Sequence, residues 1–132
     1  MREKGVKFSI RKRLASFRYA FAGLRSLLKN EHNSRVHLLF ALLAILMGCI
    51  LSISGVEWLI LVITIAIVFI TEILNSAIEK LSDFVSPEYS EIIKGVKDYC
   101  AAAVLIAAIA SVIVGLIIFL PKVIHILFSG NG

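Results

Sequence analysis

The sequence contains only two cysteines and two prolines among its 132 residues. Cys49 and Cys100 lie in or beside apolar segments and lack the spacing of a metal site or a redox motif, so we interpret them as packing residues. The Gly-rich phosphate loop of many NTPases and the signature motifs of protein kinases are also missing, which excludes nucleotide sites of these kinds. The stretch from Ala101 to Leu120 has no charged residue at all.

Apolar residues dominate what is present. Hydrophobic residues make up 59% of the chain and the mean hydropathy is +0.94, whereas ordinary soluble domains are roughly half apolar. Three apolar runs cover residues 36–53, 58–70 and 101–120. A helix that crosses a bilayer needs about 20 mostly apolar residues. The sequence therefore predicts an all-α membrane protein, with residues 1–132 forming a single membrane domain.

The basic residues are unevenly placed, and this predicts the orientation. Ten of the 14 lysines and arginines lie at or before Arg35, and three more lie at residues 80–97. Because positive charge favours the cytoplasmic side, the N-terminus and the 82–97 connection should face the cytoplasm. We expect no secretory signal peptide, since a long basic segment precedes the first apolar run. We predict membrane helices over 36–54, 57–81 and 98–120, a cytoplasmic connection over 82–97 and a tail over 121–132.

The segment over residues 8–30 has the pattern of an amphipathic helix. Its apolar side chains recur at steps of three and four residues, and its basic side chains follow a second stripe. This pattern predicts a surface helix on an anionic membrane face, and the alternative is a basic tail with little order that only sets topology. Pro87 should end the second membrane helix in a loop, which leads to a short helix around Ser90 to Val96.

The second membrane helix carries three polar residues on one stripe, Glu72, Asn75 and Glu79. Steps of three and seven residues return to nearly the same side of a helix. An ionisable residue inside a membrane segment is expensive and is a functional-site hypothesis by default. The alternative is a polar seam that only joins helices by hydrogen bonds, but two acids on one stripe fit that alternative poorly.

More polar residues converge on the cytoplasmic helix ends, namely Glu31, Lys97 and Asp98. Two carboxylates together with phosphate oxygens suit Mg²⁺, a lysine suits phosphate as a point charge, and a deeper carboxylate can take a proton from a lipid hydroxyl. The combination predicts phosphoryl transfer to a lipid alcohol. His32 and His37 are interpreted as hydrogen-bonded interfacial residues rather than metal ligands.

The segment TEILNSAIEKLSD, followed by SPEYSEIIKGVKDYCAAAVLIAA, resembles the signature of the small bacterial membrane-integral diacylglycerol kinases, a family that includes undecaprenol kinases. The similarity runs from about Ser16 to about Gly115, and SFRYAFAGLRSLLKNEHNSRVH is similar to the family's surface helix and first acidic residue. The resemblance implies an amphipathic surface helix plus three transmembrane helices in a homotrimeric bundle with composite active sites. It also implies the bacterial inner membrane, with the N-terminus and the active site on the cytoplasmic side.

The resemblance further implies transfer of the γ-phosphate of ATP to a lipid hydroxyl with Mg²⁺. It assigns Glu72 as general base, Asn75 as an essential polar neighbour, and Glu31 and Glu79 as metal-binding acids. The nucleotide contacts that it implies are Lys12, Tyr19, Glu88, Tyr89, Ser90, Lys97 and Asp98. The partners expected are therefore the lipid, ATP, the anionic membrane surface and further copies of the chain, and we expect no nucleic acid.

The sequence departs from the enterobacterial members at His37, where that branch has an acid, and at Ala101, where it has a small hydroxyl residue. The acceptor lipid, diacylglycerol or undecaprenol, therefore stays open. An ion or proton-coupled transporter that uses Glu72 as carrier site is the alternative from another class. A membrane adaptor without chemistry is a third, and it leaves the polar stripe unexplained.

Overall fold

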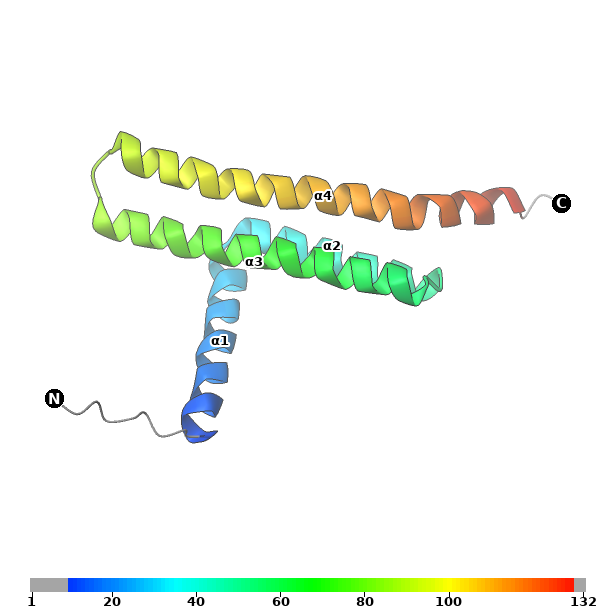
Figure 1. The fold of residues 1–132 in the computed structure, drawn as a ribbon, viewed down its shortest axis with the longest axis horizontal. Coiled ribbons are helices and arrows are strands. Elements are labelled where there is room, and N and C mark those ends of the chain that lie inside the picture. Colours follow the sequence, from blue (N-terminus) through cyan, green and yellow to red (C-terminus); the bar gives the residue numbers. More distant parts are fainter. Residues whose placement is uncertain (1–9, 130–132) are drawn as a thin grey trace.

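The computed structural model describes residues 10–129, apart from the side chains of residues 11–13. This part of the chain forms four α-helices and contains no strand. Helix α1 covers Ile10–Asn30, α2 covers His32–Ile50, α3 covers Gly55–Val85 and α4 covers Glu91–Ser129. Helices α2, α3 and α4 lie side by side, whereas α1 projects away from them at a steep angle (Figure 1). The all-helical class predicted from the sequence is confirmed.

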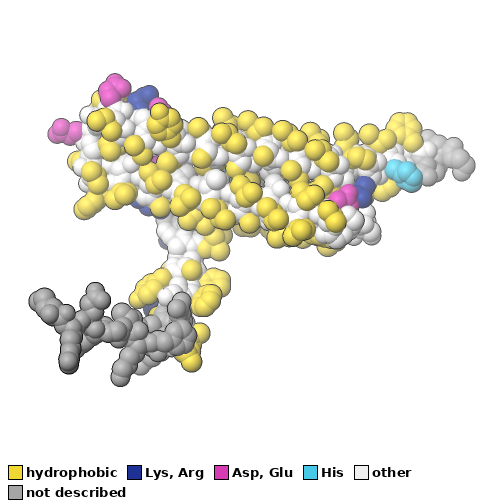
Figure 2. Space-filling model, viewed as in Figure 1, with side chains coloured by type: hydrophobic (Ala, Val, Ile, Leu, Met, Phe, Trp, Pro, Cys, Tyr) yellow, Lys and Arg dark blue, Asp and Glu magenta, His cyan; other side chains and the backbone are white. Residues whose placement is uncertain are grey.

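Three of these helices are long and apolar enough to cross a membrane, namely α2, α3 and α4. Most of their large hydrophobic side chains are exposed, and the long sides of the bundle are covered with them (Figure 2). Acidic and basic side chains gather at the two ends of the bundle instead. Soluble proteins rarely expose apolar surfaces of this size, so the chain is a membrane protein with three apolar helices, as predicted.

Helices α3 and α4 are longer than a bilayer requires. They contain 31 residues and 39 residues, or about 46 Å and about 58 Å at 1.5 Å per residue, against a hydrocarbon core of about 30 Å. The short helix predicted around Ser90 to Val96 is the first part of α4, which continues without a break. A Lys94–Asp98 ion pair of 3.1 Å, four residues apart, bridges the position where the sequence suggested a boundary.

At its other end, α4 runs through Pro121 to Ser129, where the sequence predicted only a tail. A proline inside a membrane helix is tolerated because its surroundings can satisfy the carbonyl that it leaves free. Just beyond it, Lys122 lies 3.1 Å from Glu57 at the start of α3. Glu57 also completes a capping box with Ser54, so the start of α3 is linked to the last part of α4.

The turn between α2 and α3 brings these two helices close together. Ser52 adopts a left-handed backbone conformation with φ of 48°. Below the turn, a Cβ atom at Gly48 would lie only 2.9 Å from a ring carbon of Trp58, so the contact requires a glycine. The buried cluster at this end consists of Ile53, Leu61, Ile118 and Phe119. These contacts fix how α2 and α3 face each other.

Helix α1 is joined to α2 through Glu31, whose backbone is extended with φ of −104° and ψ of 119°. The Arg35 guanidinium donates hydrogen bonds to the carbonyls of Leu28, at 2.8 Å, and Lys29, which satisfies the free carbonyls at the end of α1. Most of the large apolar side chains of α1 are exposed, including Leu14, Phe17 and Phe21, whereas Leu27 is buried. Its placement on a membrane surface stays a prediction.

Candidate functional site

The polar stripe of α3 lies on the face that packs within the bundle. Glu72 is buried, with 2% of its surface exposed, and Asn75 and Glu79 are partly buried. Ser76, one residue beyond Asn75, is also buried. The stripe predicted from sequence spacing therefore faces other parts of the chain, as an intramembrane acid should.

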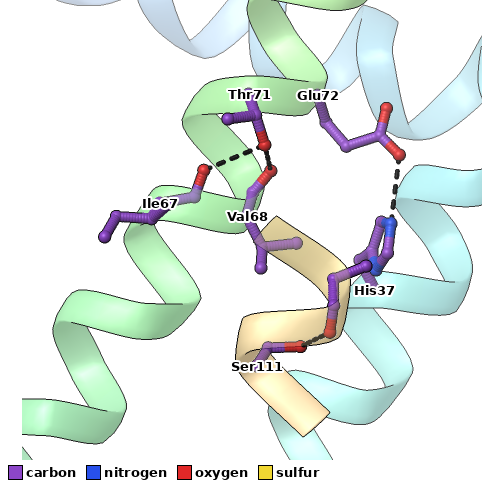
Figure 3. A network of polar contacts seen from close by, with 7 residues as sticks. His37, Ile67, Val68, Thr71, Glu72 and Ser111 are labelled. Carbon is purple, nitrogen blue, oxygen red and sulfur yellow. Dashed lines mark hydrogen bonds and ion pairs between the residues drawn. The ribbon is translucent and has the colours of Figure 1, made fainter. Parts of the chain in front are cut away.

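The carboxylate of Glu72 points toward the imidazole of His37 on α2 (Figure 3). The Glu72 Oε1 and His37 Nε2 atoms are 3.1 Å apart. This is an ion-pair distance, but the ring N–H is not aimed well enough at the oxygen to count as a hydrogen bond, and Oε1 lacks one in the described part of the chain. His37 thus contacts Glu72 but does not donate a hydrogen bond to its Oε1 atom.

Other buried polar atoms surround this pair. Among the described residues, Ser34 Oγ, Asn75 Oδ1 and Ser76 Oγ are buried and have no hydrogen-bond partner. In folded proteins, buried polar atoms are nearly always paired, and each exception calls for an explanation such as a water, an ion or a ligand. Four such atoms in the α2–α3 interface, counting Glu72 Oε1, indicate a site that is completed by something outside the single chain.

Glu31 lies at the start of α2, and Glu79 lies two turns after Glu72 toward the end of α3. Both are close enough for their charges to act on the Glu72 carboxylate. Glu31 occupies the N-cap position of α2, but its side chain makes no capping hydrogen bond, and its one ion pair is a long one of 3.8 Å to Lys80. The structure therefore brings together Glu31, Glu72, Asn75 and Glu79 from two helices, and we call them the acidic cluster.

The acidic cluster is not a preformed metal cage. In residues 10–129, no group of three or more His, Cys, Asp or Glu side chains is arranged to hold a metal ion by itself. Mg²⁺ usually keeps several waters and takes one or two carboxylates plus substrate phosphates. The weakly engaged carboxylate of Glu31 and the partly buried one of Glu79 fit that donor set, provided that phosphate oxygens supply the rest.

The remaining residues predicted for the site have other partners. Lys97 pairs with Asp83 of α3, and Asp98 pairs with Lys94. Ser90 precedes α4, and its hydroxyl lies 3.5 Å from the amide of Ile93. Glu88 is exposed in the same connection, and Tyr19 is 75% exposed on α1. These side chains are spread over α1, α4 and the α3–α4 connection. The Lys12 side chain lies outside the described residues.

Tyr89 has a specific electrostatic environment in the α3–α4 connection. Its hydroxyl donates a hydrogen bond of 2.8 Å to the Glu91 carboxylate. This bond raises the pKa of Tyr89 above its ordinary value, with smaller contributions from burial and Asp98. The phenol therefore stays protonated in the physiological range.

An apolar cavity of about 500 Å³ begins beside His37 and lies between α2, α3 and α4. Its wall includes Phe40 and Met47 of α2, Leu61 and Val68 of α3, and Ser111 and Gly115 of α4. From His37 to Met47 it follows α2 for about 15 Å at 1.5 Å per residue. Through His37, which contacts Glu72, the cavity begins beside the acidic cluster, and its other walls suit hydrocarbon.

Sequence reasoning missed His37 as the partner of Glu72, and it missed the buried hydroxyls of Ser34 and Ser76. A signal was present, because Ser34 and His37 follow Glu31 at steps of three and Ser76 follows Glu72 by four, so each continues a stripe already recognised. The cavity could not be found this way, since it depends on how three helices pack.

Comparison with known proteins gives a consistent picture. The family model described as "Prokaryotic diacylglycerol kinase" matches residues 18–119, a range that contains every predicted site residue except Lys12. The diacylglycerol kinase of Synechocystis sp. is 37% identical over 115 residues, which is 86% of this chain and 66% of that protein. The undecaprenol kinase of Bacillus subtilis is 36% identical over 107 residues, or 81% of this chain and 87% of that protein. The diacylglycerol kinase of Escherichia coli K12 is 40% identical over 95 residues, or 72% and 78%.

Proposed function

This chain belongs to the prokaryotic diacylglycerol kinase family, a family of lipid kinases, and from that premise we propose how it acts. It transfers the γ-phosphate of ATP to the hydroxyl of a membrane lipid alcohol at the acidic cluster. One observation carries this assignment: a buried carboxylate without a hydrogen bond, Glu72, contacts His37, which lines one end of an apolar cavity. A lipid whose chain occupies the cavity would present its hydroxyl to that carboxylate.

In the proposed reaction, Glu72 acts as general base. Its carboxylate takes the proton of the lipid hydroxyl as the hydroxyl oxygen forms a bond to the γ-phosphorus of ATP. The bond between the γ-phosphorus and the bridging oxygen breaks, and ADP leaves with that oxygen. Asn75, next to the base on the same face of α3, would donate a hydrogen bond from its amide nitrogen to the hydroxyl oxygen and so orient it. Glu72 then carries the proton, which must return to water before the next turnover.

Glu31 and Glu79 are the residues that would hold Mg²⁺, together with phosphate oxygens of ATP. When bound, the ion neutralises charge on the phosphoryl group in transfer. Lys97 is proposed to contact phosphate as a point charge, and Asp98, Tyr19, Glu88, Tyr89, Ser90 and Lys12 are proposed as further nucleotide contacts. The polar residues at this end of the bundle suit a water-soluble nucleotide, and we propose that the reaction takes place at the cytoplasmic face of the bacterial inner membrane.

We also propose that the working enzyme is a homotrimer with composite sites. The proposed nucleotide residues lie apart from the acidic cluster in a single chain, and three helices are too few to enclose ATP, metal and lipid. Four buried polar atoms without partners support a site that further chains complete. The exposed apolar residues of α1, such as Phe17 and Phe21, would lie in the membrane interface and the basic ones near anionic lipid.

Both named acceptors of the relatives are candidates here. We expect purified protein to transfer radiolabelled phosphate from ATP to a lipid in detergent micelles that contain either diacylglycerol or undecaprenol, in a Mg²⁺-dependent manner. Running the two lipids side by side identifies the acceptor by the higher kcat/KM. If neither lipid is labelled by protein of verified helicity and assembly, the kinase assignment for this chain is wrong.

The cavity offers a separate test of where the lipid binds. Gly115 lines it, and a Cβ atom there would meet no atom within 4 Å, so Gly115→Leu should fold and fill part of the space. We expect the KM for lipid to rise about tenfold, since overpacking a filled site costs on the order of 1–3 kcal/mol, while the KM for ATP stays unchanged.

The matched control is Ala110→Leu, which adds similar bulk to an exposed position of α4 outside the cavity. A Gly115→Leu enzyme with the same lipid KM as the Ala110→Leu enzyme would mean that the acceptor chain lies elsewhere.

A further inference from the structure

His37 contacts the buried acid and also lines the cavity. Its imidazole Nε2 lies 3.1 Å from Glu72 Oε1, and its ring forms part of the cavity wall. The ring comes from α2 and the acid from α3, so their contact spans the interface between two helices (Figure 3). The His37 side chain is 20% exposed, whereas that of Glu72 is 3% exposed.

We propose that His37 is a positioning residue, whose Nε2 holds the Glu72 carboxylate ionised and aimed at the lipid hydroxyl at the head of the cavity. This inference rests on the proposed role of Glu72 as general base. It adds a residue to the reaction that acts through the base and does not exchange atoms with either substrate.

The surroundings of Glu72 explain why such a partner is needed. A carboxylate in a membrane interior is costly unless a donor or a cation compensates it. Apart from His37, the charged side chains near Glu72 are Glu31 on the α2 side and Glu79 on α3, and both are acids, so neither can pair with its carboxylate. The ammonium group of Lys80 pairs with Glu31 and not with Glu72.

Helix α4 offers no substitute on the opposite wall. The Ser111 hydroxyl, which faces the cavity, donates its hydrogen bond to the Ala108 carbonyl at 2.8 Å. The other α4 side chains that line the cavity, Ala108, Val112, Gly115 and Phe119, have no polar group. Within residues 10–129, His37 is therefore the only side chain in contact with Glu72 that can carry positive charge. A modest rotation of its ring would turn the present contact into an aligned hydrogen bond.

Two substitutions of His37 test whether a donor must lie at the position of Nε2 or whether any polar side chain is enough. In His37→Gln, the amide nitrogen takes the place of Nε2 and keeps the reach to Glu72. In His37→Asn, the amide nitrogen takes the place of Nδ1 and falls short. Both side chains are polar and similar in size, and His32→Gln, at an exposed position of α2, is the matched control. The readout is kcat against pH for each purified enzyme, with Glu72→Gln measured alongside.

We expect the acid limb of the His37→Asn profile to move to higher pH by about one unit, because the carboxylate loses its partner, with about a tenfold loss of rate on that limb. Activity should recover at high pH, and the KM for ATP should not change. His37→Gln should lie between His37→Asn and wild type, and His32→Gln should match wild type. A merely structural role would lower kcat equally at every pH.

Profiles of both His37 variants that superimpose on wild type, or that fall uniformly without a shift, overturn the positioning role. If Glu72→Gln retains full activity, the proposed function of Glu72 fails instead, whatever His37 does. An inactive Glu72→Gln enzyme with unshifted His37 profiles leaves Glu72 as base and removes His37 from the mechanism.

Discussion

Glu72→Gln is expected to lower kcat by about 10²–10⁴-fold, the range typical of a lost general base. The carboxamide keeps the size and shape of the side chain in its buried place, but it cannot accept the hydroxyl proton. ATP binding should stay within a few-fold of wild type, because Glu72 lies deeper than the proposed nucleotide contacts. Lipid phosphorylation at saturating ATP and a separate nucleotide-binding titration measure the two effects.

The control for this change is Glu57→Gln, at the outer end of the same helix. Glutamine can replace glutamate in the capping box with Ser54, so the helix start should be preserved and activity should change little. If Glu72→Gln works as well as Glu57→Gln, the base assignment is wrong, and the buried acid has another task.

Removing either Glu31 or Glu79 is expected to raise the Mg²⁺ concentration for half-maximal rate by at least about tenfold, which corresponds to about 1.4 kcal/mol. Each carboxylate would supply one of few protein ligands to the ion. The double variant Glu31→Gln with Glu79→Gln should lose much less than the product of the single losses, since residues that share one partner are not additive. Rate measured against Mg²⁺ at fixed ATP gives all three values.

Glu91→Gln serves as the control for this series, because that acid lies outside the acidic cluster and pairs with Tyr89. Independent losses from Glu31→Gln and Glu79→Gln, each with an unchanged Mg²⁺ dependence, would show that the two acids hold the helices together and do not bind the ion.

The sequence predicted much of this molecule because the relevant signals are local. Apolar run length gave the three long helices, and residue spacing placed Glu72, Asn75 and Glu79 on one inward face. The contact between His37 and Glu72 could not be predicted in the same way. It depends on how α2 is rotated and shifted along α3, which the approach of Gly48 to Trp58 and the left-handed Ser52 determine.

The full length of the helices also could not be predicted from the apolar pattern. Hydropathy shows only where an apolar stretch ends. The helical backbone of α4 includes Lys94, Lys97 and Asp98 at one end and continues through Pro121 at the other. The proposed nucleotide residues show a further limit. They are spread over α1, the connection and α4, and spacing along one chain says nothing about which of them would meet across chains.

The unpartnered hydroxyls of Ser34 and Ser76 have a consequence for attempts to raise the thermal stability of this enzyme. In a single chain, a buried polar atom without a hydrogen bond weakens the fold, so alanine at either position should make chains that are not assembled resist heat better. Selection of heat-resistant variants in detergent would therefore collect changes in this interface first. The same changes would remove polar atoms from the edge of the acidic cluster, and the survivors would be robust but slow. Thermal stability and turnover thus depend on the same few polar atoms, in opposite directions.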